Sequence, residues 1–296
     1  MNKTLVAFDG DPMGLLSFLN AKPLAIDDLN PVPADASFAL VARIDATQIY
    51  REFVAMMETI DPNFVTSFKQ EVQQATKELG IDPVEELLLP LGDTLRLFSS
   101  PGEGGLLPSG LMGIVTVRDP KRLSAALENL ATSDAMRRET DGLAISEYQG
   151  QQIYTIRMHH ALAPSWCFRN DELLVALFPQ TLRAHLARPA DAARLSGLAP
   201  IAQPFAQLRK PRAIAYVNTP ELFPWVYTAL QLGAPTAAHE LRKQQIAMEV
   251  SVLPASSAIT RHLSPSVFML SKEPAGLLLI GRTHMQGTDP PPKQEE

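Results

Sequence analysis

The sequence predicts an α+β fold, in which a curved antiparallel or mixed β-sheet carries helices on one face. The first sign is a recurring unit: an apolar run of about five residues, a short turn and an amphipathic helical pattern. The second is a central stretch in which apolar segments flank tight turns, the pattern of antiparallel hairpins. The fold is therefore expected to contain pseudo-repeated strand-turn-helix units, and four copies of the unit begin at Phe38, Met112, Leu173 and Ala213.

Length and charge limit the functional classes. The chain has 296 residues, enough for one large or two ordinary domains, and a net charge of −6. This acidic balance gives no basic surface for duplex nucleic acid, so no nucleic-acid partner is expected. No stretch approaches the roughly 20 apolar residues of a membrane span. Asp9 and Asp11 interrupt the short apolar run at the start, so we expect no signal peptide in this chain.

Caps and prolines predict the helices of the first half. Asp45 can cap a helix whose apolar residues recur at helical spacing up to residue 60. Asp61 and Pro62 start a second helix, which Gly80 ends. Asp82 begins a shorter helix with Pro83 at its first position, and Asp119 does the same after the strand at 112–117.

The middle of the chain reads as antiparallel hairpins. Strands are expected at 144–148 and 152–158 around a turn at 149–150, and at 165–168 and 173–178 around 169–171. A short helix follows over 182–187. Next come a strand at 213–217 and a helix that Pro224 is expected to disturb, so that 219–223 forms a separate turn. The rest is expected to form helices near 236–246 and 257–263 and strands near 247–253, 266–270 and 276–282.

These elements predict four regions along the chain. Residues 1–36 are expected to form a loosely structured lead-in, and 37–190 a first α+β unit. The Ala/Pro/Leu-rich stretch 189–211 marks the boundary, and a second, related unit over 191–286 is expected to pack on the first. The polar, proline-rich residues 287–296 are expected to be a disordered tail. One large domain remains an alternative to two packed units.

The motifs of the common enzyme classes are missing. There is no Gly-x-Ser-x-Gly, no Gly-x-Gly-x-x-Gly at a strand-to-helix turn, and no metal-binding pair of histidines or cysteines at regular spacing. The glycine-rich loop at 99–105 leads into a strand, so it predicts a mobile connection and not a phosphate cradle. We therefore assign no catalytic, cofactor-binding or metal-binding residues.

Six histidines and one cysteine are the remaining candidates for chemistry. Adjacent His159 and His160 at the end of a predicted strand would point to opposite faces, and the others stand alone: His185, His239, His262 and His284. Each is most simply a surface or capped histidine. Cys167 lies between two aromatic residues and is most simply a small apolar side chain. A hydrolase with an unrecognised site near Glu147, His159, His160 and Cys167 is kept as an alternative.

Several segments together resemble a bacterial family of large, often exported hypothetical proteins built around a domain of unknown function. The resemblance spans roughly residues 30–286, and its motifs are mainly turns and caps. They are Gly80 to Pro83 with Leu91 to Asp93, Tyr148 to Tyr154, Trp166 to Gln180, and Leu253 to Pro265. The resemblance implies an envelope-associated or periplasmic location and a chain cut from a longer protein. It implies no catalytic residues.

Three functions remain open from the sequence. The first is a non-catalytic interaction or scaffold domain that binds a protein or envelope partner. The second is a carrier of a lipid or other apolar ligand, because a curved sheet with helices over one face can enclose an apolar cavity. The hydrolase is the third. No cofactor is expected, and the sequence leaves the oligomeric state open.

Overall fold

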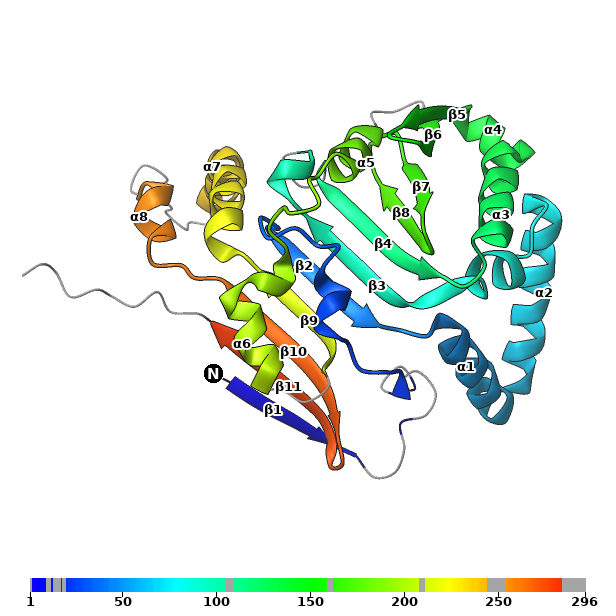
Figure 1. Ribbon diagram of the computed structural model, residues 1–296, viewed down its shortest axis with the longest axis horizontal. Coiled ribbons are helices and arrows are strands. Elements are labelled where there is room, and N and C mark those ends of the chain that lie inside the picture. Colours follow the sequence, from blue (N-terminus) through cyan, green and yellow to red (C-terminus); the bar gives the residue numbers. More distant parts are fainter. Residues whose placement is uncertain are drawn as a thin grey trace, which may run out of the picture.

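Eleven strands form one continuous antiparallel sheet in the part of the chain that the structure describes (Figure 1). The computed structural model describes residues 2–8, 12, 17, 20–104, 109–158, 162–207, 211–243 and 254–283. The strand order is β1-β11-β10-β9-β2-β3-β4-β8-β7-β6-β5. The bounds are β1 Asn2–Ala7, β2 Phe38–Arg43, β3 Leu91–Ser99, β4 Leu111–Val117, β5 Thr140–Tyr148, β6 Gln151–Met158, β7 Ser165–Arg169, β8 Glu172–Ala176, β9 Pro211–Val217, β10 Ser266–Glu273 and β11 Gly276–Thr283. The α+β class and the large antiparallel sheet are confirmed.

The predicted caps begin and end the first helices. Asp45 accepts a hydrogen bond from the Gln48 backbone at the start of α1 (Ala46–Ile60), and Asp61 and Asp82 cap α2 (Pro62–Leu79) and η3 (Pro83–Leu88). Gly80 takes a left-handed conformation at φ 73°, which ends α2 as predicted. Asp119 caps α3 (Pro120–Thr132), and α4 (Asp134–Glu139) follows it.

The later helices agree less closely with the sequence pattern. Helix α5 spans Pro179–Leu186, η5 Leu195–Gly197, α6 Ala199–Gln207 and α8 Ser256–Thr260. Helix α7 runs without a break over Thr219–Lys243. The predicted turn at 219–223 and the separate helix near 236–246 are therefore wrong, because α7 continues through Pro224. The strand predicted near 247–253 lies outside the described residues.

Strands β2 and β9 meet at the centre of the sheet and relate its two halves. Val41 pairs with Ile214, and the two residues are 173 positions apart (214 minus 41). On either side of this pair, Arg96 of β3 pairs with Val41, and Met269 of β10 pairs with Ile214. Arg96 and Met269 are also 173 positions apart (269 minus 96). The order β11-β10-β9 thus mirrors β4-β3-β2. This geometry fits a pseudo-repeated unit, although division of the chain into units at 37–190 and 191–286 stays a prediction.

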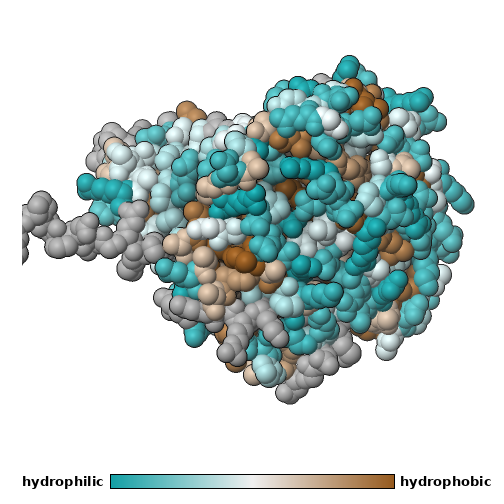
Figure 2. Space-filling model, viewed as in Figure 1, coloured by the Kyte–Doolittle hydropathy of each residue, from teal (hydrophilic) through white to brown (hydrophobic). Residues whose placement is uncertain are grey.

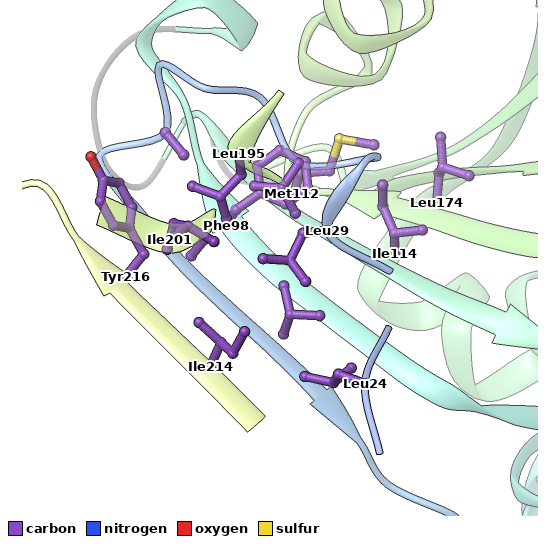
Figure 3. Close-up of a cluster of buried hydrophobic side chains, with 14 of the residues drawn as sticks. Leu24, Leu29, Phe98, Met112, Ile114, Leu174, Leu195, Ile201, Ile214 and Tyr216 are labelled. Carbon is purple, nitrogen blue, oxygen red and sulfur yellow. The ribbon is translucent and has the colours of Figure 1, made fainter. Parts of the chain in front are cut away.

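One face of the sheet carries the main core. We call it the packed face, and it bears the buried side chains of Val41, Phe98, Ile114, Ile214 and Met269. Alternation along each strand places their neighbours on the opposite face. Figure 3 shows side chains of the packed face meeting Leu24, Leu29, Leu195 and Ile201 from the segments that cross it.

The expected loosely structured lead-in is wrong where residues 1–36 are described. Strand β1 pairs with β11 along its whole length, and a Cβ on Gly276 would lie 2.1 Å from the Val6 carbonyl oxygen, so this close pairing requires glycine there. Leu24, Leu29 and Val32 are buried in the main core, and η2 (Ile26–Leu29) lies over the packed face. Backbone bonds from Leu24 to Pro211 and from Leu195 to Val32 tie the segment to later parts of the chain.

Helices α5 and α6 cover much of the packed face, while α3 packs on the other side. Leu182 and Leu186 of α5 and Ile201 of α6 join the main core, and α6 crosses β10 and β11 in Figure 1. Leu123 and Ala131 of α3 form a second cluster with Leu173 and other residues of the opposite face. From the side of α6 the surface is mainly hydrophilic, with separate apolar areas (Figure 2).

The predicted boundary at residues 189–211 contains η5 and α6, which pack on the core of this same sheet. Leu195 of η5 and Ile201 of α6 are fully buried in that core. The predicted disordered tail, residues 287–296, lies outside the described residues.

We expect Phe98→Ala to lower the free energy of unfolding by about 3–5 kcal/mol, because the buried ring would leave a cavity at the centre of the packed face. The matched control is Ile60→Ala, whose side chain is 68% exposed, with an expected change within about 0.5 kcal/mol. Urea denaturation of both variants measures the difference. Equal effects of the two substitutions would contradict this assignment of the core.

Candidate functional site

The residues proposed for a hydrolase do not converge. Cys167 pairs across strands with Leu174 and belongs to the main core on the packed face. Glu147 is exposed and pairs with Gln152, so it lies on the face opposite that core, as do Ile145 and its partner Tyr154. His159 and His160 lie outside the described residues. The Glu147 and Cys167 side chains therefore cannot share a reaction centre.

Cys167 also has the wrong electrostatic surroundings for a nucleophile. Its side chain is fully buried, and burial raises the pKa of the thiol to about 11, although the positive charge of Arg169 acts in the opposite direction. Thiol chemistry requires the thiolate, which is scarce at neutral pH under these conditions. The sequence-based interpretation of Cys167 as a small apolar core residue agrees with this environment.

His185 differs from the surface histidine that the sequence suggested. It is buried on α5, and its Nδ1 lies 2.7 Å from Oε1 of Glu103. Glu103 belongs to the glycine-rich loop, in the 3-10 helix η4 (Pro101–Glu103), and is fully buried. Residue Glu103 thus attaches the described part of that loop, residues 99–104, to α5. No local sequence signal indicates this contact, because the two residues are 82 positions apart.

A charged hollow of about 590 Å³ lies at one end of β2, β3 and β4. Arg43 donates to Asp93 at 2.9 Å and to Asp28 at 3.0 Å, and Arg118 donates to Asp45 at 2.7 Å. Each guanidinium in this network is thus matched by at least one carboxylate. The network joins strand ends to η2 and α1, and its paired charges leave little free charge for a ligand.

Asp93 shows how strongly this network is coupled. Burial alone would raise its pKa, but hydrogen bonds from Thr94 and Arg43 and the charges of Arg43 and Arg118 outweigh burial and lower the pKa. Both of its carboxylate oxygens accept a hydrogen bond from the same nitrogen of Arg43, Nη1. The arrangement is that of a structural ion pair at the strand ends.

An exposed apolar surface lies on the face of the sheet opposite the packed face. We call it the open face, and it is defined by the exposed side chains of Leu40, Val175, Phe268 and Leu279. Cross-strand pairing aligns one uncharged row over ten strands. From β11 to β5 the row is Gly281, Phe268, Ala215, Leu40, Leu97, Gly113, Val175, Trp166, Tyr154 and Ile145.

A second uncharged row runs beside the first. It consists of Leu279, Leu270, Ala213, Ala42, Leu95, Val115, Leu173 and Phe168. Helix α3 covers the end of both rows near Trp166 and Tyr154, whose rings stack with centroids 5.4 Å apart. Towards β11 the rows are open: Leu40 is 36% exposed, and Phe268 and Val175 are each 42% exposed.

The ring of Phe268 lies against Gly281 on the neighbouring strand. A Cβ at Gly281 would lie 3.2 Å from the ring, so the glycine leaves room for the aromatic side chain to lie over the backbone. At this end of the row the aromatic side chain therefore lies along the sheet surface. Such a surface offers area for packing but no reactive group.

The described part of the chain holds no cluster of three or more histidine, cysteine, aspartate or glutamate residues arranged for a metal ion. Among the helices described, none has both the length and the apolar character to cross a membrane.

Comparison with known proteins gives no relative to guide the assignment. No family model matches the chain, and neither the curated proteins nor the solved structures contain a match. The resemblance to an exported bacterial family thus stays a prediction.

We expect thiol reagents to leave Cys167 unmodified in the folded protein at neutral pH and to modify it only after unfolding. The reason is its full burial and raised thiol pKa. Labelling kinetics with and without denaturant, followed by mass spectrometry, measure this. Equal labelling rates in both states would contradict the assigned burial.

We expect Asp93→Asn to cost about 1–2 kcal/mol of stability at neutral pH, because Arg43 loses a charged partner. The lowered pKa means that the wild-type carboxylate stabilises the fold above its unfolded value near 3.8 and loses this contribution as the pH falls through the folded pKa. Denaturation at several pH values should show the two proteins converging in acid. A constant difference down to the lowest pH would contradict the ion pair.

Proposed function

We propose that this protein is a non-catalytic interaction or scaffold domain, which binds a protein partner through the open face. One observation carries the proposal: two adjacent uncharged rows cross the sheet, and the part between β11 and β8 has solvent-exposed Leu40, Val175, Phe268 and Leu279. Monomeric proteins rarely expose large contiguous apolar areas without a binding role.

The shape of the open face favours a protein partner. A sheet surface of this kind packs against another sheet or against the apolar side of a helix, with side chains interdigitating over a broad area. The depletion of charge at its centre is also the composition that distinguishes the buried core of protein interfaces. The partner is therefore expected to present an uncharged apolar surface. Association with the cell envelope is part of the proposal and follows from the family resemblance.

The carrier alternative has less support. A lipid carrier needs an apolar cavity that encloses its ligand. The hollow of about 590 Å³ is lined by charged residues such as Arg43, Asp93 and Arg118, so it does not suit acyl chains. A hollow of about 310 Å³ beside Tyr154 and Phe168 also includes Lys121 and Gln152. The hydrolase alternative has lost its proposed constellation, since Glu147 and Cys167 lie on opposite faces.

The test is a double substitution of the open face, Leu40→Lys with Phe268→Lys. Two ammonium groups in the middle of an apolar interface must be desolvated on binding, so we expect partner binding to weaken at least tenfold. Lysine stems can lie along the sheet and keep their charges in water, which should preserve the fold. Photo-cross-linking in cells identifies the partner, and titration of the purified partner then measures the affinity.

The matched control is Ile60→Lys with Leu232→Lys, which places two charges at exposed apolar positions outside the open face. It should bind the partner like the wild type. Unchanged binding by the open-face variant would contradict the proposal. Native mass spectrometry of wild type and variant separates the carrier alternative, because a lipid-range adduct that the open-face variant loses would favour the carrier and reject a protein partner.

A further inference from the structure

A second hollow, of about 240 Å³, lies outside the open face and plays no part in the proposed function. Three segments surround it: the turn at residues 30–33 after η2, the β7–β8 turn with the start of β8, and α5 with the loop that follows it. Its polar and charged lining residues are Asn30, Arg169, Asn170, Glu172, His185, Arg188 and Arg194. We call it the arginine pocket.

His185 is held in a defined tautomer at the wall of this pocket. Glu103 accepts a hydrogen bond from Nε of Arg188 at 3.0 Å, and the two side chains form an ion pair. The same oxygen lies 2.7 Å from Nδ1 of His185, so Nδ1 carries the proton and donates it to the carboxylate. In neutral His185 the lone pair then resides on Nε2. No described residue forms a hydrogen bond with Nε2.

The surroundings of Arg188 fix this geometry further. Its guanidinium also donates to Asp35 at 2.9 Å and to Ser100 at 3.1 Å. Arg188 therefore holds Glu103, Asp35 and Ser100 through its Nε and one terminal nitrogen. It positions His185 and contributes little free charge to the pocket.

Two other guanidinium groups remain available at the wall. Arg169 has no ion pair or hydrogen bond with any described residue, and Arg194 donates to the carbonyl oxygen of Ala190. Glu172 is the one carboxylate among the described lining residues, and Arg96 pairs with it at 2.8 Å. Asp171 and Asp191 neighbour lining residues in the chain but do not line the pocket themselves.

We propose that the arginine pocket binds a small phosphate-bearing anion. Arg169 and Arg194 donate to its oxygens, and Nε2 of His185 accepts the proton of its P–OH group. A phosphate monoester near its second pKa, about 6, carries both the charge and the proton that this set of groups matches. A carboxylate has charge but no proton to donate. The volume, below the roughly 300–1,000 Å³ of sites for larger organic ligands, fits a small anion.

Calorimetric titration of the full chain with inorganic phosphate near pH 6 tests the proposal, with sulfate and acetate titrated at equal ionic strength. Phosphate should bind more tightly than sulfate, a tetrahedral dianion that carries no proton at this pH, and acetate should bind weakest. Arg169→Gln and Arg194→Gln should each weaken phosphate binding about tenfold, the loss of one charge-assisted hydrogen bond. Both side chains are exposed, so neither variant should impair folding.

His185→Asn tests the contribution of the histidine separately from that of the arginine charges. The asparagine amide can still donate to Glu103 but offers nothing in place of Nε2, so the variant should keep anion binding and lose the preference for phosphate over sulfate. Arg137→Gln, an exposed arginine of α4, is the matched control and should bind like the wild type. Absence of phosphate binding at millimolar concentration, or equal weakening by Arg137→Gln and Arg169→Gln, would overturn the proposal.

Discussion

The antiparallel pairing of β2 with β9 is the constraint on which the rest of the molecule depends. It joins segments 173 positions apart, at Val41 and Ile214, and makes one sheet of two strand groups that would otherwise end in unpaired central edges. Both side chains of this pair are buried on the packed face. Once the pairing is fixed, the period of two along each strand determines which residues enter the core and which reach the open face.

The two faces then take different roles. The packed face is closed by η2, α5, η5 and α6, which come from sequence positions before and after the strands they cover. A buried guanidinium interrupts this face: Arg96, whose pKa is lowered by burial, donates to the Asp28 carbonyl oxygen and to Glu172. These contacts tie η2 and β8 to β3. The open face lacks such polar connections along its two rows, and α3 covers only one end of it.

Much of the fold followed from local rules that the sequence states directly. Asp45, Asp61, Asp82 and Asp119 cap helices, Gly80 ends one, and the Gln149-Gly150 turn takes positive φ at both residues, as a tight hairpin requires. The interpretation of residues 1–36 failed because proline-rich, irregular segments give no periodic signal even when they are buried. Leu24, Leu29 and Val32 enter the core as single side chains from a short 3-10 helix and the irregular chain around it, and only tertiary contacts reveal them.

The candidate sites were less predictable for the same reason. The run Phe38 to Ala42 is apolar at every position, a pattern typical of a strand buried on both faces, and nothing in it distinguishes a covered face from an open one. The contact of His185 with Glu103 joins α5 to η4, two helices that are far apart in the sequence. Pair contacts of this kind depend on topology, which the recurring strand-turn-helix pattern suggested only in outline.

Thiol reactivity of Leu40→Cys compared with Val41→Cys tests the central claim most directly. The two positions are neighbours in β2, and the structure places the first on the open face and the second in the core. We expect rapid labelling of the folded protein at position 40 and protection at position 41 until unfolding. Protection at both positions would mean that the open face is covered, and labelling at both would contradict the pairing of β2 with β9 in the assigned register.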